Sequence, residues 1–211
     1  MFKGAIFDVD GTILDSMWVW EEATSGFARK RGVEMTEAEL AQFKDMTLEE
    51  SMPIIKERFS LENTIEELKA EFARLCAEEY RLNVKPKPYA KEYIKSLKER
   101  GVKIAIATSG YRELCETALT RLGIMEYIDA FAFSSEVGVN KRNPDVYLLA
   151  AERIGVEPEK CMVFEDILAG VFGAKAGGMQ VTAIFDKSSA EVWGEIKENA
   201  DRAIMSWEEL L

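Results

Sequence analysis

Residues 3–12 read Lys-Gly-Ala-Ile-Phe-Asp-Val-Asp-Gly-Thr, a short apolar run that ends in two aspartates and a glycine. Such a run, bounded by turn residues, is typical of a β-strand that is covered on both faces, as in a parallel sheet. Asp8 and Asp10 are two residues apart, so an extended chain carries both carboxylates on one side. Gly11 then lets the backbone turn sharply. Because ligands of open α/β sheets bind where the strands end, this segment predicts both the fold and the position of its site.

The same pattern recurs along the chain. Further short apolar runs lie at 102–107, 130–133, 161–164 and 180–184, with a weaker candidate at 202–204. Helices with readable ends lie between later runs, at 88–100, 112–122 and 144–154, and each stops before a glycine. This alternation predicts an α/β fold, namely a doubly wound parallel sheet with a Rossmann-like core.

One stretch breaks the alternation. Residues 16–83 contain no convincing strand, but an amphipathic run at 16–31 and three capping boxes indicate about four helices. The capping boxes are Thr36 with Glu39, Thr47 with Glu50, and Thr64 with Glu67. We therefore expect residues 1–15 and 84–211 to form the α/β catalytic core, and residues 16–83 to form an inserted α-helical cap.

The composition narrows the classes of function. The 38 acidic residues outnumber the 27 basic ones, and the net charge of −11 disfavours binding to nucleic acid or anionic membranes. The chain contains no histidine, so acid–base chemistry must come from other side chains. Three scattered cysteines predict buried thiols in a reducing compartment, and no apolar run reaches the length of a membrane span. We expect a cytoplasmic protein that is a monomer or a weak dimer.

The paired aspartates themselves suggest a metal. Two carboxylates about 4 Å apart at an effective dielectric near 20 repel by about 4 kcal/mol, and a divalent cation relieves that repulsion. Oxygen ligands of this kind suit Mg²⁺. The alternative to a metal site is a capped turn, in which the carboxylate of Asp8 or Asp10 accepts hydrogen bonds from backbone amides. A calcium-binding EF-hand loop fits less well, because Thr12 and Ile13 occupy positions where it requires an acid and a glycine.

Four segments in order carry a family resemblance. Asp8-Val-Asp-Gly-Thr12 resembles the first motif of the haloacid dehalogenase-like hydrolases, whose usual reaction is phosphate-ester hydrolysis. The strand that ends in Thr108-Ser109-Gly110 resembles the second motif, and Lys141 with Asn143-Pro-Asp145 resembles the third. Glu165-Asp166 with the later glycines resembles the fourth. The resemblance spans residues 1–15 and 85–211, and it places the helical insert where this superfamily carries its C1 type of cap.

The resemblance implies a role for each motif residue. Asp8 would be the nucleophile, and Asp10 the acid and then the base. Thr108, Ser109 and Gly110 would hold phosphoryl oxygens, and Lys141 would offset negative charge. Mg²⁺ would be held by Asp8, Asp166, the backbone carbonyl of Asp10, and Glu165 either directly or through water. Each residue also has an ordinary interpretation: a helix N-cap at Thr108, a solvated lysine at Lys141, and capping acids at the fourth motif.

The resemblance leaves alternatives for the function. The favoured one is a Mg²⁺-dependent phosphatase that acts on small phosphorylated metabolites, with sugar or polyol phosphates preferred. A phosphomutase of the β-phosphoglucomutase type is the second, although Trp20 and Leu48 stand where that mutase carries a histidine and an arginine. A non-enzymatic binding protein and a dehalogenase are the others. Trp18 and Trp20 lie about 200° apart on a helix. One of them would pack in the cap and the other would line the substrate pocket, unless both are packing residues. We assign the pocket to Trp20 and the packing to Trp18, and the reversed assignment is the alternative.

Overall fold

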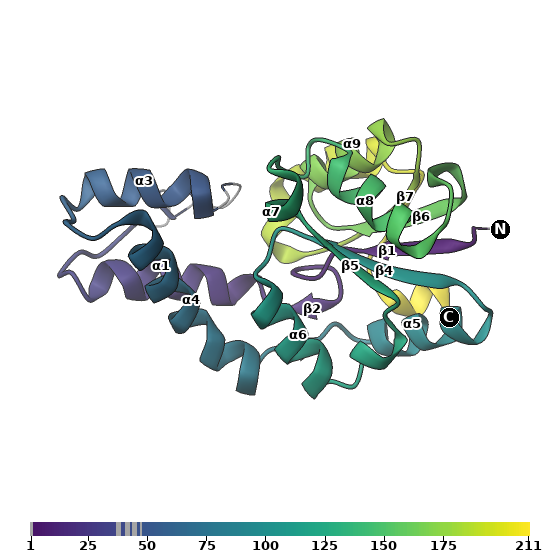
Figure 1. Cartoon of the computed structure of the whole chain (residues 1–211), viewed down its shortest axis with the longest axis horizontal. Coiled ribbons are helices and arrows are strands. Elements are labelled where there is room, and N and C mark those ends of the chain that lie inside the picture. Colours follow the sequence, from purple (N-terminus) through teal and green to yellow (C-terminus); the bar gives the residue numbers. More distant parts are fainter. Residues whose placement is uncertain (1, 37–38, 41–42, 44–45, 47) are drawn as a thin grey trace. The chain divides into compact units, whose positions relative to one another are not determined.

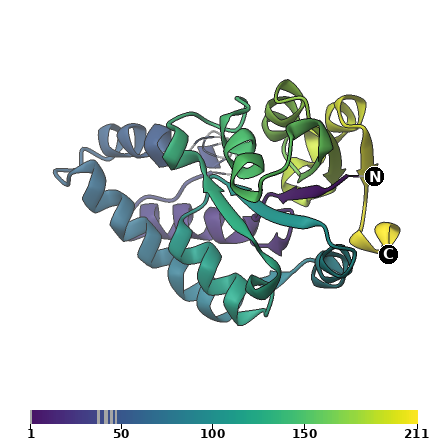
Figure 2. The same cartoon turned by 45° about the vertical axis from the view of Figure 1, so that its right-hand side comes forward.

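The chain folds as two compact units, which we describe separately. The structure is a computed structural model that describes residues 2–36, 39–40, 43, 46 and 48–211, with residues 48 and 49 described by their backbone alone. The core unit consists of Met1–Asp15 and Val84–Leu211, and the helical unit consists of Ser16–Asn83. Both are drawn in Figure 1 and, turned by 45°, in Figure 2.

The core unit is built on a parallel sheet. Its strands, as far as the chain is described, run in the spatial order β5 (Ala130–Phe133), β4 (Lys103–Thr108), β1 (Gly4–Phe7), β6 (Cys161–Glu165), β7 (Gln180–Ile184) and β8 (Arg202–Ile204). In the centre of the sheet, Phe7 of β1 is level with Ile106 and Phe164 on its two neighbours. Since parallel strands end at a common edge, the residues after β1, β4 and β6 are brought together there. The predicted doubly wound α/β fold is confirmed.

Helices cover both faces of this sheet (Figure 1). On one face lie α7 (Ser134–Val137), α8 (Asp145–Ile154), α9 (Leu168–Ala176) and α10 (Trp193–Asn199). On the other lie α5 (Ala90–Glu99) and the C-terminal 3₁₀ turn η4 (Trp207–Leu210). The chain leaves β4 into α6 (Arg112–Arg121). Shorter 3₁₀ turns are η1 (Met125–Tyr127), η2 (Pro158–Lys160) and η3 (Lys187–Val192).

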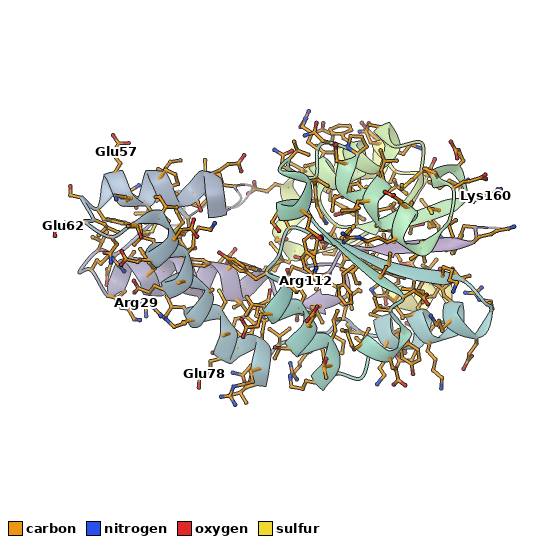
Figure 3. The ribbon with its side chains drawn as sticks, in the orientation of Figure 1. Arg29, Glu57, Glu62, Glu78, Arg112 and Lys160 are labelled. Carbon is orange, nitrogen blue, oxygen red and sulfur yellow. The ribbon has the colours of Figure 1, made fainter. Side chains whose placement is uncertain are left out.

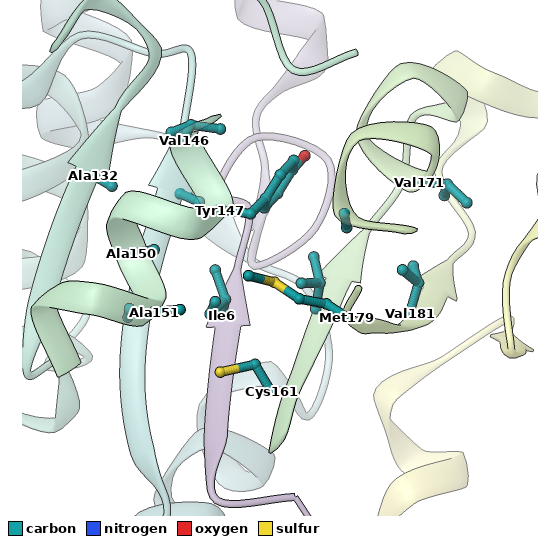
Figure 4. Packing of buried hydrophobic residues seen from close by; sticks show 14 of the residues in the cluster. Ile6, Ala132, Val146, Tyr147, Ala150, Ala151, Cys161, Val171, Met179 and Val181 are labelled. Carbon is teal, nitrogen blue, oxygen red and sulfur yellow. The ribbon is translucent and has the colours of Figure 1, made fainter. Parts of the chain in front are cut away.

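Strand alternation divides the apolar residues between two cores. Ile6 and Val163 point to one face and join a buried aliphatic cluster with α8 and α9, which Figure 4 shows from close by. Phe7 and Phe164 point to the other face, where their rings stack with centroids 4.6 Å apart. The ring of Trp207 lies 5.2 Å from that of Phe164, and the Trp207 indole donates to the carbonyl of Thr12 at 3.0 Å. The C-terminal turn therefore supports the loop that follows β1.

The helical unit contains α1 (Met17–Arg29), α3 (Leu48–Arg58) and α4 (Ile65–Leu82) among its described residues. The capping box of Thr64 and Glu67 is present at the start of α4. Thr36 and Glu39 also exchange both hydrogen bonds of a capping box. Two of the three predicted helix starts are thus confirmed, while the one at Thr47 lies outside the described residues.

The two connections between the units lie side by side within the core unit. Leu14–Asp15 forms strand β2 and Lys85–Pro86 forms strand β3, which pair antiparallel. Just after β3, the Lys87 ammonium lies 2.8 Å from the Asp186 carboxylate and donates to the Phe185 carbonyl at 2.7 Å. Both crossings are therefore tied to the end of the sheet at which β1 and β7 finish.

Charged side chains lie mainly on the outside of each unit. Figure 3 labels Glu57, Glu62 and Glu78 on the helical unit and Lys160 on the core unit, and these side chains reach outward from the ribbon. Within the described residues we find no helix both long and apolar enough to cross a membrane.

Candidate active site

Asp8 stands at the centre of the edge where the strands end. Its amide donates to the Phe164 carbonyl at 3.0 Å, which continues the pairing of β1 with β6 by one residue, and its side chain is buried. Gly11 adopts a φ of +88°, which L-residues rarely adopt. A Cβ atom at Gly11 would lie 2.2 Å from Oδ2 of Asp166. The glycine therefore lets the loop after β1 fold directly onto the Asp166 carboxylate.

Three buried carboxylates converge at this edge. Asp8, Glu165 and Asp166 each present an oxygen, and these atoms lie within 4.8 Å of one another. Oδ1 of Asp166 accepts from the Thr12 hydroxyl at 2.9 Å, whereas Oδ2 is buried with no hydrogen-bond partner in the described structure. Burial, followed by the charges of Asp8 and Glu165, raises the pKa of Asp166 well above its ordinary value. The site thus contains more negative charge than its own donors satisfy.

Lys141 supplies the positive charge of the cluster. It lies in the turn between α7 and α8, and its ammonium donates to Oδ1 of Asp8 and to Oε1 of Glu165. The side chain is only 4% exposed, so the interpretation of a solvated lysine does not apply. Burial alone would lower the pKa of Lys141, but the two carboxylates outweigh that effect and raise it. Lys141 is therefore a buried cation shared by two acids.

Glu165 is enclosed on all sides. Its carboxylate is 0% exposed, and the Tyr147 hydroxyl of α8 donates to Oε1 at 2.6 Å. A Cβ atom at Gly170 would lie 2.4 Å from Cδ of Glu165, so the backbone of α9 lies directly against the carboxylate. Burial and the charge of Asp8 raise the pKa of Glu165, and Lys141 and Tyr147 oppose that rise.

The second motif lies beside Asp10. Thr108 ends β4, and its hydroxyl accepts from the Gly110 amide at 3.0 Å, so in this structure that amide is already engaged. The Ser109 hydroxyl lies 2.9 Å from that of Ser134. A Cβ atom at Gly110 would lie 2.9 Å from Oδ2 of Asp10, which shows how closely the two motifs approach. Cys115 adjoins them, and burial and then the charge of Asp10 raise the pKa of its thiol well above normal.

The two tryptophans belong to the helical unit, and the structure overturns the expectation for Trp18. Trp20 packs against rings of α4, with its centroid 6.0 Å from that of Phe72 and 6.2 Å from that of Tyr80. Trp18 is 38% exposed, so the prediction that it packs in the interior is wrong. At about 100° per residue, Trp20 lies about 20° from the buried Phe27 around α1, while Trp18 lies about half a turn away.

The residues of the cluster fit a divalent cation. Three carboxylates face one ammonium, which leaves about two negative charges in a buried place if all are ionised. All the candidate side-chain ligands are oxygens, which suits Mg²⁺ better than zinc. Oδ2 of Asp166, which has no hydrogen-bond partner in the described structure, could serve as a ligand atom for such an ion.

Sequence reasoning missed two contributors to this cluster. Thr12 belongs to the first motif but was assigned no role there, although its hydroxyl holds Asp166. Tyr147 lies two residues after the third motif, and its partner Glu165 is 18 residues further on, so no local pattern connects them.

Comparison with known proteins finds a matching family model, similar sequences and a similar solved structure. A family model described as haloacid dehalogenase-like hydrolase matches residues 5–184. A phosphorylated carbohydrates phosphatase of Thermotoga maritima is 30% identical over 84% of this chain and 82% of its own length. A validoxylamine A 7'-phosphate phosphatase of Streptomyces hygroscopicus is 31% identical over 92% and 91%. The crystal structure of CbbY from Rhodobacter sphaeroides with phosphate, 22% identical, superposes with a TM-score of 0.88 over 100% of this chain and 96% of that one, which shows a shared fold.

Proposed function

The chain belongs to the haloacid dehalogenase-like hydrolase family, and from that premise we propose that it is a phosphatase that hydrolyses small phosphorylated metabolites through an aspartyl-phosphate on Asp8. The observation that carries the proposal is the position of Asp8, buried at the end of the central strand and paired with the ammonium of Lys141. The two phosphatases named above support a phosphate monoester as the substrate, and the first of them favours sugar or polyol phosphates.

The proposed reaction has two steps. In the first, a carboxylate oxygen of Asp8 attacks phosphorus, the P–O bond to the alcohol breaks, and Asp10 gives its proton to the leaving oxygen. In the second, Asp10 takes a proton from water, the water oxygen attacks phosphorus, and inorganic phosphate leaves Asp8. The proximity of Asp10 to Gly110 supports these roles, since the transferring group would lie between the first and second motifs. The ammonium of Lys141, in the third motif, lies against Asp8, where it would offset negative charge during the attack.

The remaining motif residues bind and balance charge in this proposal. Thr108, with the amides of Ser109 and Gly110, would donate to phosphoryl oxygens, which requires the Gly110 amide to exchange its bond to Thr108 for one to substrate. Lys141 would offset the charge on Asp8 and on the phosphoryl group. Mg²⁺ would be held by Asp8, Asp166, the Asp10 carbonyl and Glu165, and when bound it would neutralise the carboxylates and polarise a phosphoryl oxygen.

We further propose that the helical unit serves as the cap of this site. Its two connections pass through the paired strands β2 and β3, and β2 follows directly on the loop that carries Asp10 and Gly11. Such insertions exclude water during ester attack and open to release product. Trp20 stays a candidate for the wall of the substrate pocket, and the exposed Trp18 is now the second candidate.

A phosphate-release screen tests the proposed function. The intact protein is incubated with Mg²⁺ and a panel of sugar, polyol, nucleotide and amino-acid phosphates, and inorganic phosphate is measured. We expect turnover concentrated on sugar and polyol phosphates. No release from any ester would contradict the proposal, whereas phosphate transfer that needs a bisphosphate activator would point to the mutase alternative.

The two tryptophans give a matched pair of variants. We expect Trp20→Ala to lower the melting temperature by about 4–8 °C, because losing a half-buried aromatic costs roughly 2 kcal/mol and a chain of this length shifts by about 2–4 °C per kcal/mol. Trp18→Ala should melt within about 2 °C of wild type, since its side chain is exposed. Thermal unfolding measures both, and the substrate panel measured on both variants shows which tryptophan shapes substrate choice. A larger loss of stability in Trp18→Ala would contradict this prediction.

A further inference from the structure

Among the described residues, Tyr147 is the one member of the buried cluster that the motifs do not include. It lies in α8, belongs to the same buried hydrophobic cluster as Ile6 and Ala150, and is fully buried. Figure 4 shows its hydroxyl oxygen at the end of the side chain that points away from Cys161 and out of the apolar cluster. That oxygen donates to Oε1 of Glu165 at 2.6 Å. The buried Tyr147 hydroxyl therefore has the Glu165 carboxylate as its hydrogen-bond acceptor.

The acceptor of this hydrogen bond is immobilised. Oε1 of Glu165 accepts from both Tyr147 and Lys141, and Oε2 accepts from the Asp166 amide at 3.2 Å. Because Gly170 has no side chain, the backbone of α9 packs directly against the Glu165 carboxylate. A Cβ atom added at Gly170 would lie closer to that carboxylate than van der Waals contact allows. Glu165 therefore cannot turn without breaking contacts on every side.

The Lys141 ammonium is shared by two carboxylates, so a hydrogen bond from Tyr147 to one of them affects the other. The ammonium donates to Asp8 as well as to Glu165, so the two acids compete for one cation. A second donor on Glu165 weakens the interaction of that carboxylate with the Lys141 ammonium, because the negative charge of the carboxylate is then shared between two hydrogen bonds.

We propose that Tyr147 is a positioning residue of the active site, which acts through Glu165 to hold the Lys141 ammonium against Asp8. The inference rests on the proposed function for its effect on turnover, although the contact network itself does not depend on it. Tyr147 touches neither substrate nor reacting atoms in this proposal. Its contribution is to favour the contact of Lys141, the only ammonium in the described cluster, with Asp8 over its contact with Glu165.

The kinetic test compares Tyr147→Phe with Tyr93→Phe. The second variant is the control, because Tyr93 is a buried tyrosine of the same unit that packs against Phe164 and Trp207 on the opposite face of the sheet. We expect Tyr147→Phe to lower kcat about tenfold with KM changed about twofold or less, since Lys141 is most needed when charge develops on the phosphoryl group. Tyr93→Phe should keep kcat within about twofold. Equal kcat values for Tyr147→Phe and wild type would overturn the inference.

A double-mutant cycle separates positioning from packing. If Tyr147 acts through the charge of Glu165, Tyr147→Phe should change kcat less than about twofold in a Glu165→Gln background. A tenfold loss in both backgrounds would show an independent structural effect and overturn the inference. If Tyr147→Phe does not fold, Glu165→Gln tests the hydrogen bond between Tyr147 and Glu165 by changing its acceptor instead of its donor.

A spectroscopic readout keeps the test independent of turnover. The ¹⁵N–¹H signal of the Lys141 ammonium is assigned by its loss in Lys141→Arg and compared between variants. We expect it to shift in Tyr147→Phe and to stay in place in Tyr93→Phe. An unchanged signal in both overturns the inference. If wild type releases no phosphate but this signal shifts, the proposed function fails while the positioning role of Tyr147 stands.

Discussion

Replacing Asp8 by asparagine should abolish phosphate release, with kcat lower by a factor on the order of 10⁴ or more, as for the loss of a nucleophile elsewhere. An amide cannot form the acyl phosphate, and the carbonyl oxygen of the substituted side chain is a poor nucleophile. The fold should persist, because Lys141 keeps Glu165 as its partner and the removal of one charge relieves repulsion on Glu165 and Asp166. Turnover on the preferred ester and a thermal melt measure the two effects.

The control for this variant loses the same charge at an exposed position. Glu62→Gln removes one carboxylate from the surface of the helical unit and should leave kcat within about twofold. Beryllofluoride with Mg²⁺ mimics a phosphorylated aspartate and should stabilise wild type but not Asp8→Asn. Substantial turnover by a well-folded Asp8→Asn protein would mean that another residue forms the covalent intermediate.

Removal of Mg²⁺ should stop the reaction completely and should also weaken the fold. Excess EDTA leaves Asp8, Glu165 and Asp166 facing each other with Lys141 as the only ammonium that the described structure places among them. At a Mg²⁺ concentration about 100-fold above its Kd, binding adds about 2.7 kcal/mol to the free energy of unfolding. For a chain of this length that raises the melting temperature by about 5–10 °C.

Asp166→Asn provides the control for the metal prediction. This variant replaces the carboxylate whose Oδ2 has no hydrogen-bond partner in the described structure, so it should lose most of the Mg²⁺-dependent rise in melting temperature. Activity that returns on adding Mg²⁺, but not Zn²⁺, would agree with a site made of oxygen ligands. Full activity of wild type in excess EDTA would refute the metal requirement.

Local pattern sufficed for the large elements of the core. The apolar runs predicted as strands, including the weak one at 202–204, all lie in the sheet, because strands buried on both faces must be apolar throughout. Strands β2 and β3 escaped prediction, since two residues each carry no periodicity and their pairing joins positions about 70 residues apart. The side of α1 that bears Trp18 was also misjudged, because about 200° of separation does not say which tryptophan faces α4.

The order of the elements and the identity of the residues that follow each strand could be predicted from local sequence patterns. Asp8, Thr108, Glu165 and Asp166 stand at or just after strand ends, and a parallel sheet brings such positions to one edge whatever the other side chains are. Which side chains then contact one another was decided only by the tertiary structure. Lys141 is shared by Asp8 and Glu165 because α8 and α9 pack closely enough to bury all three, with Gly170 leaving room for the carboxylate. Tyr147 joins them because a buried carboxylate must find donors where packing places them, and such a requirement has no counterpart in the local sequence.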